Sequence, residues 1–191
     1  MAHVTILGNG NMGQAIASVL GKGGSSVQVL DTSEAGTAIS GEIVVLAVPH
    51  SALADIVAAR ADQLAGKTVV DITNPVNFET FDSLVVPADS SAAAELAAQL
   101  PQSRVLKAFN TNFAATLATG KIGDDVTTVL VAGNDGDAKS QLIDIVKAGG
   151  LNAIDAGALS RARELESLGF LQITLAAAER ISWTGGFSVT G

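Results

Sequence analysis

Cysteine and tyrosine are absent from the 191 residues, and histidine occurs only at His3 and His50. Without cysteine, the chain forms no disulfide, thiolate nucleophile or thiolate metal site. The two histidines lie far apart in the sequence, and neither belongs to an HxxxH or His-Asp cluster, so we expect no bound metal. The lack of tyrosine also excludes the catalytic Tyr-Lys pair of the short-chain dehydrogenases.

Basic residues are few, because eleven Lys and Arg stand against nineteen Asp and Glu and give a net charge of −8. Nucleic-acid binding depends on Lys and Arg that neutralise phosphates, so we expect no nucleic-acid partner. The longest unbroken apolar run is Ile43–Val48, far short of the ~20 residues that cross a bilayer. The start, Met1-Ala2-His3, shows no basic region or cleavage site. We therefore expect no membrane partner and a cytoplasmic protein.

Short β-rich runs alternate with Ala-rich stretches along the chain, which is typical of βαβ units and predicts an α/β fold with a mainly parallel sheet. The length fits a single domain over 1–191, with a sheet core over 1–158 and a C-terminal helical appendage over 159–191. We expect strands at His3–Leu7, Val27–Leu30, Ile43–Val48, Thr68–Ile72, Val105–Ala108, Thr127–Val131 and Asn152–Asp155. We expect helices at Met12–Leu20, Ala52–Leu64, Ala92–Leu100, Asp137–Lys147 and Arg161–Ile181.

Three segments refine this pattern. The run Val44–Val48 is apolar at every position, which favours a central strand buried on both faces. The stretch Thr32–Gly41 is too short and too rich in Gly, Ser and Thr for a full crossover helix. The stretch Thr73–Ser91 has no helical period, and so long a loop in a compact domain favours a functional role.

A GxGxxG motif stands between the first predicted strand and the first predicted helix, as in the phosphate-binding turn of a doubly wound Rossmann fold. Its residues, all expected to bind cofactor, are Gly8, Asn9, Gly10, Asn11, Met12 and Gly13. Gly8 permits the tight turn, Gly10 lets the pyrophosphate approach the backbone, and Gly13 lets the helix pack closely. We expect a side chain at Gly10 or Gly13 to block binding without unfolding the protein. The alternative is an ordinary glycine-rich turn.

Asp31 follows the second predicted strand at the position where Rossmann folds place an acid that binds the adenosine ribose. A carboxylate there repels a 2′-phosphate, and no basic residue occurs between Lys22 and Arg60, so charge favours NAD over NADP. The alternative is an aspartate that caps its own turn. Thr32 and Ser33 can still donate to a phosphate.

The glycine motif, the segment Val44–Pro49 and the segment Asp71–Pro75 together resemble the NADPH-dependent deazaflavin (coenzyme F420) reductases. They are also similar to the cytosolic domain of the six-transmembrane metalloreductases. Further matching segments extend the resemblance almost to the C-terminus: Lys107–Thr111, Gly133–Asp135, Asp155–Gly157 and Arg163–Leu168.

The resemblance implies an oxidoreductase whose NADP or NAD lies across the carboxyl edge of the sheet. The glycine motif would hold the pyrophosphate. The residues expected under the adenosine side are Ala47, Val48, Pro49 and His50, and those expected to border the nicotinamide are Asn74, Pro75, Ala108, Phe109 and Asn110. Members of the family mostly use NADP, with Ser or Thr and Arg or Lys after the second strand, where this chain has Asp31–Glu34.

Hydride transfer to a flavin or deazaflavin requires alignment more than a protein acid, so the sequence assigns no catalytic residue. If a proton donor is needed, His50 is the candidate, and a surface histidine at a helix start is the alternative. Lys107 could be a general acid or anion anchor, but we favour a lysine that snorkels at a sheet edge or pairs with a carboxylate. Asn110 and Asn112 can bond the carboxamide or cap a helix before Ala114.

Three aspartates, Asp71, Asp135 and Asp155, end strands or begin turns, and we interpret them as structural. The C-terminal helix carries many apolar side chains, which can pack in the core or form a dimer interface. They are Leu165, Leu168, Phe170, Leu171, Ile173, Leu175 and Ile181, with Trp183 nearby. We favour a homodimer with a small-molecule redox acceptor near this seam.

Two other interpretations stay open. A non-catalytic NAD(P)-binding redox sensor would use the same turn and strands. Enzymes of the 3-hydroxyisobutyrate or 6-phosphogluconate dehydrogenase type share the N-terminal half but need a large helical C-terminal domain. Only about thirty residues follow the last predicted strand, which is too few for such a domain.

Overall fold

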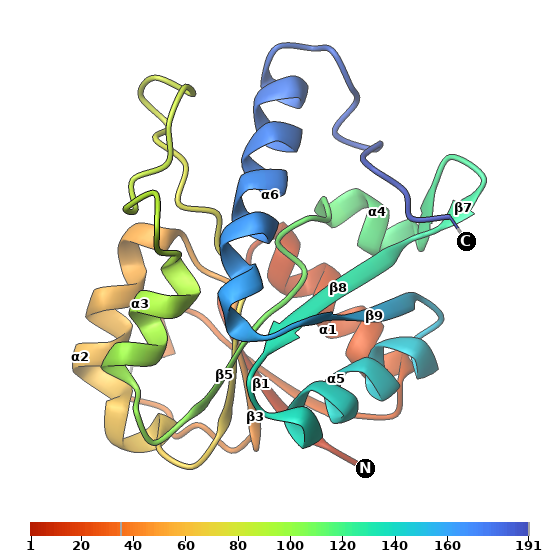
Figure 1. The fold of residues 1–191 in the computed structure, drawn as a ribbon. Coiled ribbons are helices and arrows are strands. Elements are labelled where there is room, and N and C mark those ends of the chain that lie inside the picture. The colour runs from red at the N-terminus through yellow and green to blue at the C-terminus, as the bar shows by residue number, and fades with distance from the viewer. Residues whose placement is uncertain (35, 191) are drawn as a thin grey trace.

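One seven-stranded sheet organises the computed structural model, which describes residues 1–34 and 36–190 apart from the side chain of Thr32 (Figure 1). Its strand order is β2-β1-β3-β4-β5-β8-β9. The strands are β1 His3–Leu7, β2 Ser26–Leu30, β3 Ile43–Leu46, β4 Thr68–Asp71, β5 Arg104–Lys107, β8 Thr128–Gly133 and β9 Asn152–Gly157. The strands β6 Lys121–Ile122 and β7 Asp125–Val126 form a separate small hairpin.

Helices cover both faces of the sheet (Figure 1). The α-helices are α1 Asn11–Lys22, α2 Leu53–Leu64, α3 Ala92–Gln99, α4 Ala114–Thr119, α5 Gly136–Ala148 and α6 Ala162–Ala177. Short 3₁₀ turns are η1 Thr32–Glu34, η2 His50–Ala52 and η3 Leu159–Arg161. Apolar side chains of α1, α4 and α5 form one core with the sheet, and those of α2, α3, η3 and the start of α6 form the other.

The central strand shows how the sequence produces two cores. Successive side chains of a strand point to opposite faces of a sheet. Ile43 and Val45 of β3 therefore enter the core of α1 and α5, whereas Val44 and Leu46 enter the core of α2 and α3. All four side chains are 0% exposed, which confirms the prediction of a central strand buried on both faces.

All seven predicted strands and five predicted helices form, with shifted ends. The helix predicted over Arg161–Ile181 is η3 followed by α6, and it ends at Ala177 because Glu179 adopts a φ of 56° and the chain turns back. The helix α4 and the hairpin β6–β7 are additional elements that the sequence pattern did not indicate. The η1 turn confirms the abbreviated second crossover.

The direction of the last two strands corrects the expectation of βαβ units throughout. β8 pairs antiparallel with β5, and β9 runs parallel to β8. The chain returns from β5 through the short α4 and the β6–β7 hairpin instead of a long crossover helix, and an antiparallel return needs no crossover. As a consequence, β1, β3, β4 and β5 end at one edge of the sheet, and β8 and β9 end at the other.

A buried ionic cluster of Lys107, Asp71 and Glu166, here called the Lys107 cluster, ties four elements together. The Lys107 Nζ atom, in a side chain that is 0% exposed, lies 2.8 Å from Asp71 Oδ2 and 2.7 Å from Glu166 Oε1. It also donates to the carbonyl oxygen of Thr73 at 2.6 Å. Of the two structural roles expected for Lys107, pairing with a carboxylate is confirmed, and snorkelling at a sheet edge is wrong because the side chain is fully buried.

Glu166 has a second role at the start of α3. Its carboxylate accepts the backbone N–H groups of Ala92 at 2.9 Å and Ala93 at 3.2 Å, which are free donors at a helix N-terminus. The positive end of the helix dipole and Lys107 both favour the charged carboxylate. One side chain of α6 thus fixes α3, β4 and β5 relative to each other.

We predict that Lys107→Met lowers the free energy of unfolding by about 3–5 kcal/mol, because it leaves two buried carboxylates without their cation. Urea unfolding followed by circular dichroism measures this loss. The control is Arg161→Met, since the Arg161–Glu164 pair is exposed and should move the urea midpoint little. Equal midpoints for the two variants would show that the cluster does not hold the fold together.

Candidate functional site

The glycine motif forms the turn from β1 into α1 at the edge where β1, β3, β4 and β5 end. A Cβ atom at Gly8, whose φ is 118°, would lie 2.1 Å from the Ala47 carbonyl oxygen. A Cβ at Gly13 would lie 2.1 Å from the Gly8 carbonyl oxygen. A Cβ at Gly10 would meet no described atom within 4 Å. Packing therefore requires Gly8 and Gly13, whereas Gly10 borders open space that a ligand can approach.

The N-terminus of α1 beside this open space can bind an anion. Gly10 is the N-cap residue. Among the described residues no side chain caps this end of α1, and no acidic residue lies in the first turn of the helix. The Asn9 side chain accepts from Gln14 instead. Uncapped N–H groups and the helix dipole together favour a negatively charged group at this position.

A cavity of about 500 Å³ starts at this turn. Asn11 and Met12 of the motif form one part of its lining, and Ile72 and Asn74 after β4 form another. The remaining lining residues are Phe78, Asn110, Asn112, Phe113, Ala114, Ala115, Ile173 and Trp183. Apolar walls with a few convergent polar groups are typical of small-molecule sites.

Four asparagines line this cavity, and three of them, Asn74, Asn110 and Asn112, are held by hydrogen bonds on its inner side. Asn110 Nδ2 donates to Asn74 Oδ1 at 2.9 Å and to the Leu165 carbonyl at 2.8 Å, while Asn74 Nδ2 donates to the Asn110 carbonyl at 2.8 Å. Asn112 Nδ2 donates to the Thr128 carbonyl at 3.0 Å. These bonds orient each amide. The α4 N-cap is Phe113, with no side-chain cap, so the alternative that Asn110 or Asn112 caps this helix is wrong.

Two amide oxygens of this group are left without a partner. Asn110 Oδ1 and Asn112 Oδ1 accept no hydrogen bond within the described part of the chain, although their residues are only 4% and 5% exposed. A buried acceptor without a donor is unfavourable, and most such atoms in folded proteins are satisfied. A ligand with N–H donors would satisfy these two oxygens.

Other expected nicotinamide-side residues lie behind the cavity surface. Ala108 and Phe109 are fully buried in the core, and Phe109 adopts a φ of 63° where the chain leaves β5. That left-handed conformation is strained for a bulky residue, and such strain is concentrated at functional sites. Pro75 is also buried, and its carbonyl accepts the Val85 N–H at 2.7 Å.

The segment expected under the adenosine side follows β3. Ala47 and Val48 are half-buried, and Pro49 is exposed. His50 is half-buried and opens η2, so it is a helix-start histidine, as the alternative expected. Within the described part of the chain none of these four residues lines the 500 Å³ cavity, and Ala47 and Val48 lie against Gly8 of the glycine turn.

Asp31 closes its own turn at the end of β2. Its Oδ1 atom accepts the Ser33 hydroxyl at 2.5 Å and the Ser33 N–H at 2.8 Å. These two bonds, of which the bond from the hydroxyl has the larger effect, hold the pKa of the Asp31 carboxyl below its usual value. The alternative of a turn-capping aspartate is therefore present in the structure. The side chain of Thr32 lies outside the described residues.

Arg60 is a residue at this end of the site that the sequence pattern did not indicate. It lies on α2 and is 7% exposed, and its Nη1 donates to the Thr37 carbonyl at 2.8 Å and its Nη2 to the Glu34 carbonyl at 3.0 Å. The fold therefore brings a guanidinium against the loop that follows β2. Counting basic residues along the chain could not show this, because 26 positions separate Arg60 from Glu34.

The remaining aspartates are structural, as expected. Asp135 caps α5 through the Ala138 N–H at 2.8 Å. Asp155 pairs with Lys139 at 2.7 Å, and that hydrogen bond lowers the Asp155 pKa. Asp135 follows β8 and Asp155 lies in the second half of β9, so both lie toward the opposite edge of the sheet from the glycine turn.

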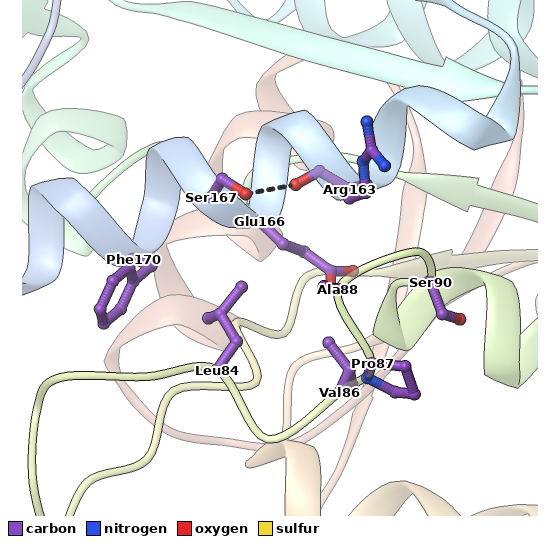
Figure 2. A pocket seen from close by; sticks show the side chains of 9 residues that line it. All are labelled: Leu84, Val86, Pro87, Ala88, Ser90, Arg163, Glu166, Ser167 and Phe170. Carbon is purple, nitrogen blue, oxygen red and sulfur yellow. Dashed lines mark hydrogen bonds between the residues drawn. The ribbon is translucent and has the colours of Figure 1, made fainter.

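A second cavity of about 400 Å³ lies between α6 and the 73–91 segment (Figure 2). Two of its polar side chains already have partners inside the protein. Glu166 belongs to the Lys107 cluster, and the Ser167 hydroxyl donates to the Arg163 carbonyl at 2.9 Å. The described residues hold no group of three or more His, Asp or Glu that could bind a metal, and none of their helices is long and apolar enough to cross a membrane. We therefore centre the candidate site on the first cavity.

Comparisons with known proteins identify relatives of this chain. Residues 25–75 match the family described as NADP oxidoreductase, coenzyme F420-dependent. The F420-dependent NADP reductase of Methanothermobacter thermautotrophicus is 31% identical over 170 residues, covering 85% of this chain and 72% of that one. The rat metalloreductase STEAP3 is 32% identical over 184 residues, and this chain spans 36% of its length. A crystal structure from Arthrobacter sp. FB24, described as a candidate F420-dependent NADP reductase, matches all of both chains with a TM-score of 0.86 and 26% identity.

We predict that Gly10→Val abolishes dinucleotide binding in a folded protein, because the new side chain fills the open space beside the α1 N-terminus. Gly13→Val collides with the Gly8 carbonyl and should also lower the melting temperature, which corrects the expectation that both variants keep the fold intact. Calorimetric titration and thermal melting measure the two effects.

The matched control is Gly21→Val, because a Cβ at Gly21 of α1 also meets no described atom within 4 Å but lies near the far end of the helix. This control should bind as the wild type does. Undiminished binding by Gly10→Val would remove the turn from the site.

Proposed function

Because this chain belongs to the family of F420-dependent NADP reductases, we propose that it transfers a hydride from NADPH to a flavin-like or deazaflavin-like acceptor. The observation that carries this proposal is one continuous cavity. It joins an uncapped helix N-terminus at Gly10 to the partnerless amide oxygen of Asn110. A nicotinamide dinucleotide has the matching groups, an anionic pyrophosphate at its centre and a carboxamide with N–H donors on the nicotinamide ring.

The residues of the cavity fit this cofactor. The backbone from Gly8 to Gly13 would hold the pyrophosphate, with Asn9, Asn11 and Met12 beside it. Asn110 Oδ1 would accept the carboxamide N–H, and Asn74 holds the Asn110 amide in place through the 2.9 Å bond. The bound cofactor supplies a hydride, and the acceptor takes that hydride together with one proton from water.

The cavity lining also favours one class of acceptor. It consists of amide, aromatic and aliphatic side chains. Such groups bind and orient a ring but transfer no proton, so catalysis rests on alignment. A conjugated ring that delocalises the incoming charge is suited to this site, whereas a simple carbonyl would need a protein acid.

We propose NADP as the cofactor, with NAD as the alternative that the test decides. The first support is the family. The second is that the Asp31 carboxylate already accepts two hydrogen bonds from Ser33, which holds it to its own turn. The third is that Arg60 places a positive charge against the loop after β2, which weakens the charge argument for NAD.

We predict steady-state NADPH oxidation with a flavin or deazaflavin as acceptor, and a dissociation constant for NADPH at least about tenfold below that for NADH. Absorbance of the reduced nicotinamide follows turnover, and calorimetry measures both affinities. An acceptor panel of FMN, a deazaflavin, a ferric chelate and a quinone identifies the class.

The variant Asp31→Ser with Ser33→Arg is the control for the cofactor site. It should tighten NADPH further, because a guanidinium binds a phosphate bidentately, and it should not tighten NADH. A wild type that binds NADH tenfold more tightly would show that Asp31 holds the ribose. Tight NADPH binding without turnover on any acceptor would favour a redox sensor.

We also propose a homodimer formed through α6. Leu171 lies on this helix and is 49% exposed, although large apolar side chains are unfavourable in water. Neighbouring Leu168 and Leu175 are half-buried on the same helix. A second copy packed against this face would cover them.

We predict that light scattering shows a dimer at micromolar concentration and that Leu171→Glu gives a monomer, since it introduces a charge into the apolar interface. The matched control is Val126→Glu, an equally exposed apolar residue in the β6–β7 hairpin, which should stay dimeric. A monomeric wild type would refute the proposal.

A further inference from the structure

The segment after α6 folds back over the candidate site. Figure 1 shows it in dark blue, leaving the end of α6 and running toward the β6–β7 hairpin. The turn at Glu179 reverses the chain, and the Arg180 N–H donates to the Leu175 carbonyl at 2.8 Å. This segment, residues 182–187, is called the tail below.

A single buried side chain fixes the tail to the core. Gln172 of α6 is 2% exposed. Its Nε2 donates to the Thr111 carbonyl at 3.1 Å, and its Oε1 accepts the Phe187 N–H at 3.0 Å. The tail is thereby held beside the segment that links β5 to α4, where Asn110 and Asn112 lie.

The tail brings Trp183 to the cavity. Its ring lies 4.9 Å from the Phe113 ring, measured between centroids, and both side chains line the cavity. Phe78, from the 73–91 segment, lines the same cavity. Trp183 is 52% exposed and Phe78 is 62% exposed. Aromatic surface left in water next to a cavity would be buried by a planar ligand that stacks on it.

Asn112 gives an independent indication of a ligand at this end of the cavity. It precedes Phe113, the residue that contacts Trp183, and its Oδ1 atom has no partner among the described residues. The side chain is 5% exposed and lines the cavity. A ring that stacked on Trp183 and carried an N–H donor could satisfy this oxygen.

We propose that the tail and the 73–91 segment form the acceptor subsite, in which Trp183 and Phe78 bind a planar conjugated ring and Asn112 accepts its N–H. This inference rests on the proposed function and adds that the chain's tail, rather than its sheet, selects the acceptor. Trp183 is a specificity-determining residue in this subsite. Acceptors without a planar ring do not use it.

The composition of the chain permits a direct test. Trp183 is the only tryptophan and there is no tyrosine, so tryptophan fluorescence reports this residue alone. We predict that FMN, titrated into the wild type saturated with NADP⁺, quenches this fluorescence saturably. NADP⁺ prevents turnover, so the titration measures binding of FMN without the reaction.

Kinetics on variants supply the second readout. Trp183→Ala should raise the KM for FMN and for a deazaflavin by about threefold to tenfold, which is the size of an aromatic pair interaction. In this variant the affinity for NADPH and the KM for a ferric chelate should stay within about twofold of the wild-type values. Trp183→Phe should recover most of the lost affinity for FMN.

Phe78→Ala should act like Trp183→Ala. Its control is Val85→Ala, an exposed apolar residue of the same segment that does not line the cavity; Phe81 is unsuitable because its ring contacts Phe78.

The outcomes separate this inference from the proposed function. Turnover with FMN but no saturable quenching would overturn the acceptor subsite and leave the proposed function standing. Saturable quenching without turnover would support the subsite and overturn the proposed function. Equal rises in KM for FMN and the ferric chelate would show that Trp183 only supports the fold, and this would also overturn the subsite.

Discussion

The position of α6 depends on the Lys107 cluster, and the site depends on α6. Glu166 anchors this helix to β4, β5 and the start of α3 through one buried carboxylate. Burying three charges is unfavourable unless each has its partners, so the helix has little freedom to move without leaving a charge unpaired. The next contacts along the helix follow from this anchor. Asn110 donates to the Leu165 carbonyl, and a Cβ at Gly169 would lie 2.3 Å from Asn74 Oδ1. The Lys107 cluster thus fixes the position of α6, which forms part of the cavity wall.

Local patterns in the sequence were sufficient for the strands of the seven-stranded sheet, for five of the helices and for the glycine turn, but not for α4 or the β6–β7 hairpin. A strand buried on both faces has an apolar residue at every position, and Ile43–Leu46 shows this directly. The antiparallel direction of β8 could not be predicted in this way, because no local pattern shows that α4 and a hairpin replace a crossover helix between β5 and β8. The roles of Arg60, Glu166 and Gln172 were equally hidden. Each acts through contacts with residues distant along the chain, and only the three-dimensional structure brings these groups together.

The end of β2 shows why a charge count along the chain is a weak guide to cofactor preference. The Asp31 carboxylate accepts hydrogen bonds from the hydroxyl and the N–H of Ser33, and these two bonds stabilise its negative charge without any ligand. A buried guanidinium from α2 lies against the same loop and contributes a field of opposite sign. The potential at the 2′ position is the sum of both groups. That sum depends on how α2 packs, which the order of residues after β2 does not record.

The two halves of the cavity are built from different kinds of structure. The proposed cofactor side adjoins the glycine turn, where Gly8 lies too close to the Ala47 backbone, and Gly13 too close to the Gly8 backbone, to admit any larger residue. The other side is made by Phe78 and Trp183, which come from irregular segments and keep half or more of their surface exposed. Substitution on the first side distorts the sheet edge, whereas substitution on the second side changes only what the cavity can contact. Substitutions at a few residues of the 73–91 segment and the tail could therefore change which acceptor is bound, while the glycine turn proposed to bind the dinucleotide stays the same.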